Sequence, residues 1–265
     1  MNACISVLPQ KGFTMVELIM VIVIAGILAI GSVQFIGQAT QGYSDAADRQ
    51  QLATIGWIAS EKISRELRNA LPNSARLNTL RKCLEFIPMV GGSHYLTLPG
   101  DTPLTPKSFT AVSSGLTPTP TGNRVAVYPT STGGVYGKNN PGPLSTSTVS
   151  SISSVDDVDT ITLGSDFIFS TGSPERRFYF TQNPIMYCID GSRLYRYSGY
   201  GINTSFTIPA ASNRQIIVDK LNSTSSSFLI APATLTRNAI VSMHFRLDNG
   251  ATHEVDQEVQ IRNVP

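Results

Sequence analysis

The sequence predicts an α+β fold, in which one long N-terminal helix packs on an antiparallel β-sheet domain. An apolar run fills residues 13–37, and apolar residues then recur at helical spacing as far as residue 70. Short β-rich runs separated by turn residues fill the rest of the chain. We therefore divide the chain into a leader (1–12), a helix (13–71) and a β-rich globular domain (72–265).

The composition limits the class of protein. The chain has 265 residues and a formal net charge of +2, and only 14% of its residues are charged. Globular proteins average about 25%, so this deficit argues against a soluble cytosolic enzyme covered with lysine and glutamate. With 41% hydrophobic residues the chain is too apolar to be disordered. Its balanced charge gives no electrostatic reason to expect nucleic acid as a partner.

The first half of the predicted helix is long enough to cross a membrane. Residues 18–36 contain no charged residue, and as a helix they would be about 28 Å long, close to the thickness of a bilayer core. Glu17 is the single charge inside the apolar run. A carboxylate near the edge of a membrane-spanning helix costs about 2–3 kcal/mol to insert. Glu17 therefore either lies hydrated at headgroup depth or has a positively charged partner.

The second half of the predicted helix is amphipathic. Six apolar residues recur at steps of three and four, which defines one face of a helix. These residues are Leu52, Ile55, Ala59, Ile63, Leu67 and Ala70. Pro72 ends the pattern, because Leu71 before it is pushed away from helical angles. The continuous helix would be roughly 88 Å long, and we expect its amphipathic face to pack on the β-rich domain.

The order of features around Gly12 predicts a processing site. Lys11 and Gly12 precede the apolar run, and no small-residue cleavage motif clearly ends it, unlike a secretory signal. A peptidase that cut after Gly12 would leave the whole helix in the mature chain, with Phe13 as its N-terminus. The free amine of Phe13 and the carboxylate of Glu17 would then lie on one face of the helix.

This stretch closely resembles the signal of type IV prepilins, a basic leader that ends in Gly and is followed by Phe-Thr-Met-Val-Glu-Leu and a long apolar run. The resemblance implies a pilin-like fold. It also implies that a prepilin peptidase cuts between Gly12 and Phe13 and methylates Phe13. Glu17 would pair with the N-terminal amine of a neighbouring subunit during assembly. The leader carries one lysine, Lys11, which still favours a cytoplasmic N-terminus.

The β-rich domain shows short runs typical of antiparallel sheets. The candidate strands are residues 84–87, 95–98, 124–128, 160–163, 178–180, 185–189, 193–197, 216–218, 227–230, 240–247 and 254–261. Residues 108–156 are rich in Ser, Thr, Gly and Pro, which is typical of a flexible linker, a decorated surface or a long inserted loop. The strands on both sides favour a loop inserted within one domain.

One hairpin is predicted within residues 185–197. Asp190 and Gly191 tolerate positive φ and suit a two-residue turn between two β-rich runs. This turn would place Cys188 opposite Arg193.

The C-terminal hairpin follows a stricter pattern, because apolar and polar residues alternate along both of its strands. A shift of one residue would exchange the two faces, so joining apolar face to apolar face requires a loop of odd length. A three-residue loop at 249–251 satisfies this condition. It places Arg246 opposite Glu254, and His244 opposite Asp256.

The chain has three cysteines, Cys4, Cys83 and Cys188. Cys4 lies in the leader and would be lost on cleavage. The other two form an even pair in a domain exported across the inner membrane, where thiols oxidise. We expect a Cys83–Cys188 disulfide, and two buried free thiols are the alternative. Closing a loop of about 105 residues would stabilise the domain by up to roughly 4–5 kcal/mol in the chain-entropy model.

The sequence offers no catalytic or metal-binding pattern. HExxH, nucleophile-elbow, P-loop and paired CxxC motifs are not found, so we expect no enzyme, no cofactor and no metal site. His244 and His253 fall on opposite faces of the last hairpin. Asp156, Asp157 and Asp159 present clustered oxygens that suit calcium, but without the full EF-hand spacing an exposed turn is the better interpretation.

Longer stretches resemble minor subunits of two systems. The length itself favours a minor subunit over a major pilin. Residues 187–196, with the pattern Tyr-x-Ile-Asp-Gly-x-x-Leu-Tyr-Arg, and the terminal hairpin resemble the J-type minor pseudopilins of type II secretion. Residues 64–74, followed by 83–86, look more like minor pilins of MSHA pilus systems. The resemblance implies a role in initiating or capping pilus assembly.

The same resemblance implies the partners and the location. The partners would be other minor and major pilins, the prepilin peptidase, the inner-membrane assembly platform and membrane lipid. The chain would be a single-pass protein of the bacterial inner membrane with a periplasmic C-terminal domain, and part of a pilus after assembly. The alternatives are a type II secretion pseudopilin and a pilus-displayed adhesin, which would need an exposed groove with residues such as Tyr195, Tyr197 and Tyr200.

Overall fold

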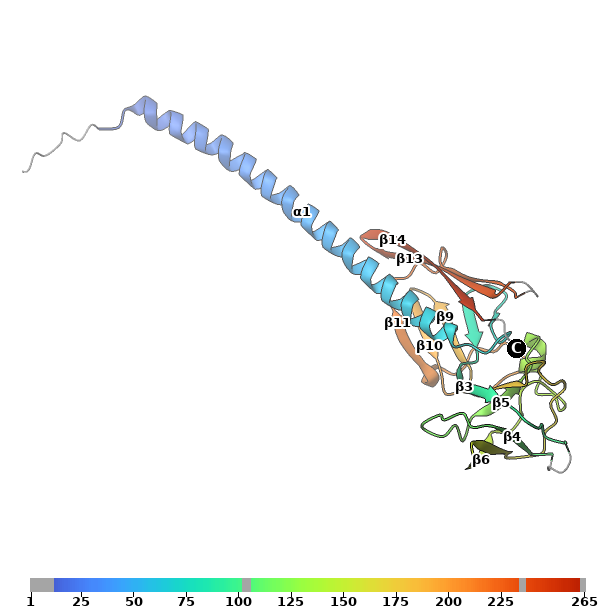
Figure 1. The fold of residues 1–265 in the computed structure, drawn as a ribbon. Helices are drawn as coiled ribbons and strands as arrows, with labels where there is room; N and C mark the ends of the chain where they lie inside the picture. The colour runs from blue at the N-terminus through green and yellow to red at the C-terminus, as the bar shows by residue number, and fades with distance from the viewer. Residues whose placement is uncertain (1–11, 102–105, 234–236, 263–265) are drawn as a thin grey trace, which may run out of the picture. The chain divides into compact units, whose positions relative to one another are not determined.

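The computed structural model describes residues 12–101, 106–233 and 237–262 (Figure 1). Two compact units make up the chain, residues 1–50 and residues 51–265. In its described part, the first unit consists of the N-terminal end of the chain and most of helix α1. The second unit contains the last turns of this helix and all the described strands.

Helix α1 spans Met15–Arg68 and has 54 residues, which corresponds to about 81 Å. It begins later and ends earlier than the predicted range 13–71. At the start, the side chain of Thr14 accepts a hydrogen bond from the first turn and so marks the boundary of the helix. At the end, the backbone N–H groups of Asn69 and Ala70 donate to carbonyls three residues back, which tightens the last turn.

Two antiparallel sheets and the end of α1 form the first layer of the second unit (Figure 1). The five-stranded sheet contains, in spatial order, β1 (Arg76–Leu77), β2 (Cys83–Phe86), β9 (Ile185–Asp190), β10 (Arg193–Tyr197) and β11 (Arg214–Val218). The three-stranded sheet contains β12 (Ser227–Ala231), β13 (Ala239–Asn249) and β14 (Ala251–Ile261). A short 3-10 helix, Ala211–Asn213, precedes β11.

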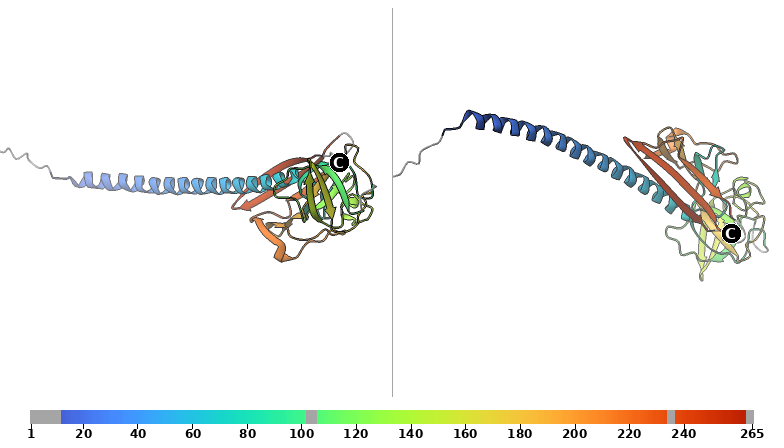
Figure 2. Two further views of the ribbon diagram at one scale, coloured as in Figure 1. Left: turned by 60° about the horizontal axis from the view of Figure 1, so that its bottom comes forward. Right: turned by 90° about the horizontal axis from the view of Figure 1, so that it is seen from above.

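The predicted amphipathic face of α1 is the face that the structure buries against these two sheets. Leu52, Ile63 and Leu67 are fully buried, in one core with residues of both sheets. Ile55 is partly buried and packs against the same core. Both views of Figure 2 show the long β13–β14 hairpin beside this part of the helix. The fold is therefore the predicted α+β, pilin-like one, with a long N-terminal helix packed on antiparallel sheets.

A second pair of antiparallel sheets is formed by the chain between β2 and β9. One contains, in spatial order, β3 (Met89–His94), β8 (Arg177–Thr181) and β5 (Arg124–Val127). The other contains β4 (Ser108–Val112), β7 (Val158–Leu163) and β6 (Val149–Val155). A short helix, α2 (Thr132–Tyr136), follows β5.

Five phenylalanines dominate the core between these two sheets. They are Phe109, Phe167, Phe169, Phe178 and Phe180. Their rings meet edge to face, with centroids 5.1 Å apart for Phe178 and Phe180 and 5.3 Å apart for Phe109 and Phe178. Such pairs add about 0.5–1.5 kcal/mol each beyond the burial of their area. The two largest hydrophobic cores of the second unit are therefore separate, one against α1 and one between these two sheets.

The structure adds regular elements that the sequence did not predict. Residues 108–156, whose composition predicts a loop, contain β4, α2 and β6 in addition to β5, which matches the strand predicted at 124–128. The prediction of a strand at 95–98 is wrong, because the strand in this region is β3, which ends at His94. The two glycines of β3 explain the difference. A Cβ on Gly92 would lie 2.4 Å from the carbonyl oxygen of Phe178, so this strand pairs with β8 only because glycine allows the close approach.

The two predicted hairpins differ in outcome. In the C-terminal hairpin the register is confirmed, with Arg246 opposite Glu254 and His244 opposite Asp256. In the β9–β10 hairpin the predicted register is wrong by one pair. The structure places Arg193 opposite Asp190, so the turn residues are Gly191 and Ser192. Of these two, Gly191 has a positive φ of 57°, as a turn with glycine in its first central position requires.

Candidate processing and assembly site

The start of α1 is held by a side-chain cap. The Oγ1 of Thr14 accepts a hydrogen bond from the backbone N–H of Glu17 at 3.3 Å. The carbonyl of Thr14 accepts the first intrahelical bond, from the N–H of Leu18 at 3.2 Å. Thr14 and Glu17 thus occupy the first and fourth positions of the Thr-x-x-Glu capping pattern. The carboxylate also lies in the first turn, where the helix dipole favours negative charge.

Gly12 and Phe13 precede the helix and are exposed. The phenylalanine side chain is 76% exposed, and no other group lies within 4 Å of the position of a Cβ on Gly12. The peptide bond between them is therefore accessible and free of helical hydrogen bonds. Lys11 and Cys4, which belong to the predicted leader, lie outside the described residues.

The carboxylate of Glu17 has no ionic partner among the residues that the structure describes. The salt bridges there all lie beyond residue 60. The predicted partner of Glu17, an N-terminal amine of a second subunit, would have to come from outside this chain. Gly12, Phe13 and Glu17 nonetheless lie within five residues of one another, around one helix start.

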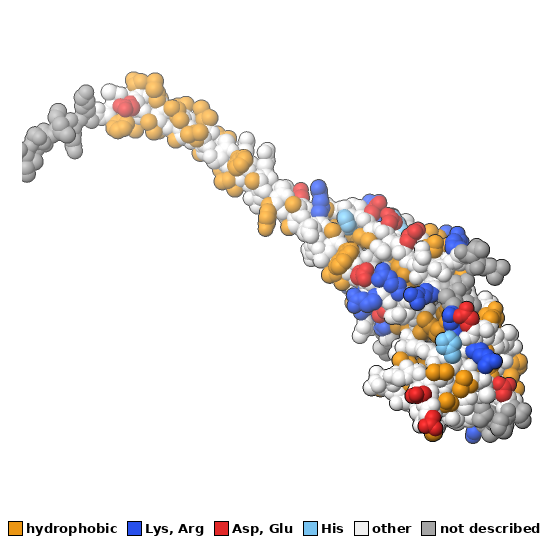
Figure 3. Space-filling model, viewed as in Figure 1, with side chains coloured by type: hydrophobic (Ala, Val, Ile, Leu, Met, Phe, Trp, Pro, Cys, Tyr) orange, Lys and Arg blue, Asp and Glu red, His pale blue; other side chains and the backbone are white. Residues whose placement is uncertain are grey.

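The N-terminal part of the first unit presents an apolar surface. No described residue from 12 to 47 is buried, and hydrophobic side chains gather on the part of the helix nearest its start (Figure 3). The large exposed ones from residue 13 to residue 36 are Phe13, Met15, Val16, Leu18, Ile19, Met20, Val21, Ile22, Val23, Ile24, Ile27, Leu28, Ile30, Val33, Phe35 and Ile36. The helix is long and apolar enough to cross a membrane. Each such side chain gains about 1.5–3 kcal/mol from full burial, so this surface requires lipid or neighbouring helices.

The comparison with known families concerns this same stretch. Residues 8–33 match the prokaryotic N-terminal methylation motif. The motif is a type IV pilin-like signal, and it covers Gly12, Phe13 and Glu17. It indicates a substrate of prepilin peptidase that assembles as a pilin-like structural subunit. Together with the long apolar helix, it fits a membrane-anchored pilin. No curated protein and no solved structure matches the chain.

In the second unit, a charged residue of α1 ties the helix to the five-stranded sheet. The Tyr187 hydroxyl donates to Oε2 of Glu66 at 2.9 Å, and Nε of Arg196 lies 3.1 Å from both carboxylate oxygens. Burial and the nearby Glu66 carboxylate raise the pKa of Tyr187 far above its ordinary value. Burial opposes the charge of Arg196, but the bond to Glu66 outweighs it and raises the pKa of Arg196.

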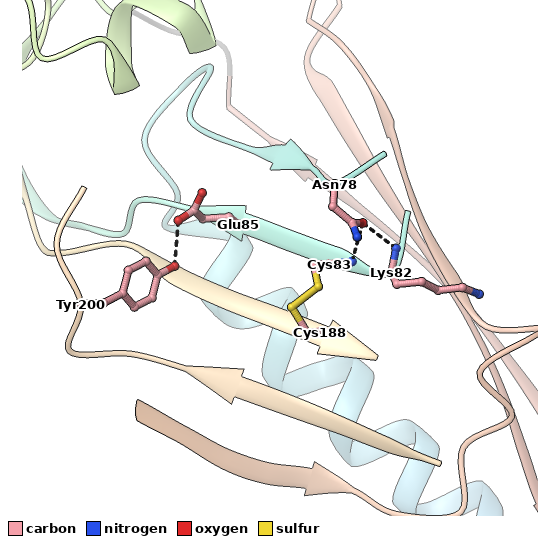
Figure 4. The surroundings of a disulfide bond; sticks show 6 residues. All are labelled: Asn78, Lys82, Cys83, Glu85, Cys188 and Tyr200. Carbon is pink, nitrogen blue, oxygen red and sulfur yellow. Dashed lines mark hydrogen bonds between the residues drawn. A yellow bond between two sulfur atoms is a disulfide. The ribbon is translucent and has the colours of Figure 1, made fainter. Parts of the chain in front are cut away.

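The structure joins Cys83 and Cys188 in a disulfide (Figure 4). The two residues are direct cross-strand partners on β2 and β9, with their Cα atoms 4.1 Å apart. The side-chain oxygen of Asn78 accepts hydrogen bonds from the N–H groups of Lys82 and Cys83, at 2.8 and 2.9 Å. This turn therefore fixes the start of β2 where the disulfide crosses to β9.

A buried carboxylate on β2 was not predicted from the sequence. Glu85 is 1% exposed and receives hydrogen bonds from Nε of Arg76 and from the Tyr200 hydroxyl, the latter at 2.9 Å (Figure 4). The Arg76 guanidinium also lies 3.5 Å from the ring centre of Tyr136. Burial, followed by the Glu85 charge, raises the pKa of Tyr136 and Tyr200 well above the ordinary value. A lone glutamate inside the apolar run Cys-Leu-Glu-Phe was the available signal.

The remaining candidates take structural positions. Tyr195, Tyr197 and Tyr200 are buried in one cluster with the disulfide, so they do not line an exposed groove. Asp156 and Asp157 form the predicted turn, between β6 and β7, and both have positive φ.

Proposed function

We propose that this chain is a minor type IV pilin of the MshO type, from an MSHA pilus system, which takes part in initiating or capping pilus assembly. The observation that carries the proposal is the methylation motif at residues 8–33, continuous with an exposed apolar helix. The resemblance of residues 64–74 and 83–86 to MSHA minor pilins supports the narrower assignment. In this role the chain is a structural subunit and not an enzyme.

Before assembly, residues 18–36 hold the chain in the inner membrane with the β-rich domain in the periplasm. Prepilin peptidase cuts the accessible bond between Gly12 and Phe13 and methylates the new N-terminus. The cap at Thr14 lies beyond the cut, so the mature helix keeps its hydrogen-bonded first turn. The cut thus creates a positively charged amine close to the Glu17 carboxylate without disturbing the helix.

Assembly then joins neighbouring helices. A carboxylate and an ammonium group about 4 Å apart attract by roughly 4 kcal/mol at an effective dielectric constant of about 20. That exceeds the cost of about 2–3 kcal/mol for placing Glu17 alone at the membrane edge. The pairing of Glu17 with the Phe13 amine of an adjacent subunit therefore favours the assembled state. Because the chain has this glutamate, we place it below the tip of the filament.

The type II secretion pseudopilin remains the main alternative, since it would use the same motif and helix. Mass spectrometry of intact chains from sheared filaments and from inner membranes separates the two. The minor-pilin proposal expects a methylated Phe13 terminus in the filament fraction. Processed chain found only in membranes would favour the pseudopilin. An intact Met1 terminus in cells with an active prepilin peptidase would contradict both.

A further inference from the structure

The C-terminal strand β14 is an edge strand with one open side. In its three-stranded sheet it pairs with β13, and no other described strand lies beside it. No described residue outside this hairpin forms a backbone hydrogen bond with β14. The open side is 11 residues long, which corresponds to about 37 Å. Its outward backbone N–H and C=O groups are therefore available to a further strand.

The other edge strands of the described sheets are short or interrupted. β1, β4, β5, β11 and β12 have between 2 and 5 residues each, and β3 and β6 have register shifts against their neighbours. Short strands and bulges are two common means by which proteins keep a sheet edge from pairing with another chain. β14 has neither feature, because its register with β13 runs without a shift from end to end. It also contains no proline and no lysine, so its edge is the one best suited to accept a strand among the sheets described.

The charge on the exposed face of β14 limits which strand can pair there. Three carboxylates alternate along the strand, so they lie on one face, and all three residues are exposed. They are Glu254, Asp256 and Glu258. Opposite them on β13 lie one arginine, one histidine and one serine. These three residues, which we call the acidic stripe, therefore carry negative charge that β13 does not balance.

We propose that the edge of β14 binds an extended segment of a different chain, in which basic and apolar side chains alternate. The basic side chains would lie beside the acidic stripe, and the apolar ones would lie on the other face, beside Val255, which packs against the core. In such strand addition the backbone hydrogen bonds give affinity and the side chains give specificity. A second copy of this chain is excluded as the occupant, because two paired β14 edges would bring acidic stripes side by side. The inference goes beyond the proposed function, since it concerns the β-rich domain and not the helix start.

The test is calorimetric titration of the full processed chain in detergent micelles with a synthetic peptide of alternating lysine and valine. The comparators are a peptide with the same residues in two blocks and a peptide of alternating glutamate and valine. We expect the alternating lysine peptide to bind roughly tenfold more tightly than either, because only this peptide can place all its charges beside the acidic stripe. Equal binding of the block peptide would overturn strand addition. Equal binding of the glutamate peptide would overturn the role of charge, and the absence of binding by the lysine peptide would overturn the site.

Hydrogen exchange and two variants locate the bound peptide. The lysine peptide should slow amide exchange in β14 and leave it unchanged in β12, the other edge of the same sheet. The combined variant Glu254→Gln, Asp256→Asn and Glu258→Gln should weaken binding roughly tenfold. Glu175→Gln should leave binding unchanged, and it is the matched control because Glu175 is an exposed carboxylate that pairs with an arginine outside this sheet. Equal slowing of exchange in β12 and β14, or equal losses of binding in the two variants, would contradict the proposed site.

Discussion

At the scale of single residues, one short sequence serves two purposes. Thr14 and Glu17 form a helix cap, and the carboxylate of Glu17 is placed in the first turn without a partner of its own in the described chain. The cap requires only the backbone N–H of Glu17, so its side chain remains available. The arrangement therefore separates the folding of the helix start from the pairing that we propose for assembly.

Changing Glu17 to Ala should reduce incorporation into sheared filaments by roughly tenfold or more, because the pairing with a neighbouring amine is lost. The domain should stay folded, since Glu17 lies outside the second unit. Immunoblotting of sheared filaments and of membranes measures both. Glu61→Ala is the control, because it removes a carboxylate of the same helix beyond the apolar run. Normal amounts of the Glu17→Ala chain in filaments would refute the assembly role.

A second residue-scale feature is Gly56, the buried glycine where α1 meets the C-terminal hairpin. A Cβ there would lie 2.7 Å from Cγ2 of Val255 and 3.0 Å from Cδ1 of Leu247. We expect Gly56→Ala to lower the free energy of unfolding by about 1–3 kcal/mol, the usual cost of overpacking. Gly42→Ala, in open space on the same helix, should have no such effect. Denaturant unfolding of both variants in detergent checks this, and equal stabilities would contradict the close contact.

At the scale of elements, the sequence predicted those features that follow from side-chain periodicity. The apolar face of α1 and the register of β13 and β14 are confirmed, because each depends on burying one face of a regular element. Short strands that depend on pairing partners were missed. The glycines of β3 and the serines of β6 have low strand propensity, and only β8 and β7 hold them extended.

The residues proposed for processing and assembly could be named from the sequence, and the partners of the buried carboxylate of Glu85 could not. Gly12, Phe13 and Glu17 are close in sequence, so a linear motif contains the whole site. Glu85, Tyr136 and Tyr200 come from three segments far apart in the chain. They come together only through tertiary packing that no local pattern shows.

Three buried tyrosines give the second unit a stability limit at high pH. Burial raises the pKa of Tyr136, Tyr187 and Tyr200 in the native state. Above about pH 10 the unfolded chain releases these protons while the native chain keeps them. The free energy of unfolding should therefore fall as pH rises above 10, by up to about 1.4 kcal/mol per pH unit for each tyrosine.

Denaturant unfolding measured from about pH 8 to about pH 11, on both sides of the ordinary tyrosine pKa, gives this slope. Tyr187→Phe should make the slope shallower, because it removes one of the titrating groups. It should also lower the stability at neutral pH by about 1.5–3 kcal/mol, since a hydrogen bond to the Glu66 carboxylate is lost. An unchanged slope in the variant would mean that Tyr187 does not stay protonated in the native state.

At the scale of the whole molecule, the two largest cores of the second unit differ in which parts of the chain form them. The first core gathers residues from α1, from the strands near Cys83 and Cys188, and from the C-terminal hairpin. The second core lies entirely within the chain between the two cysteines. The disulfide therefore closes the chain segment that contains the second core into a covalent loop. The two ends of this loop meet where β2 pairs with β9 in the five-stranded sheet.

Replacing both cysteines with serine should lower the free energy of unfolding by about 2–5 kcal/mol, because the unfolded chain regains the freedom of a long loop. The separation of 105 residues puts this pair among the long loops. Chemical unfolding of the double variant and of the parent chain measures the difference. Equal stabilities would mean that the unfolded chain is already compact between the cysteines.

The position of this loop also decides how the subunit carries tension. A pull applied between α1 and the C-terminal hairpin passes from β2 to β9 through the covalent bond, so the chain between them bears no load. The second core can then unfold without lengthening the subunit between α1 and the C-terminal hairpin. In single-molecule stretching, the roughly 370 Å contained in this loop should appear only after reduction. For a protein proposed to work in a filament, the disulfide therefore carries the pulling force past the chain between Cys83 and Cys188, and this part of the domain stays unloaded.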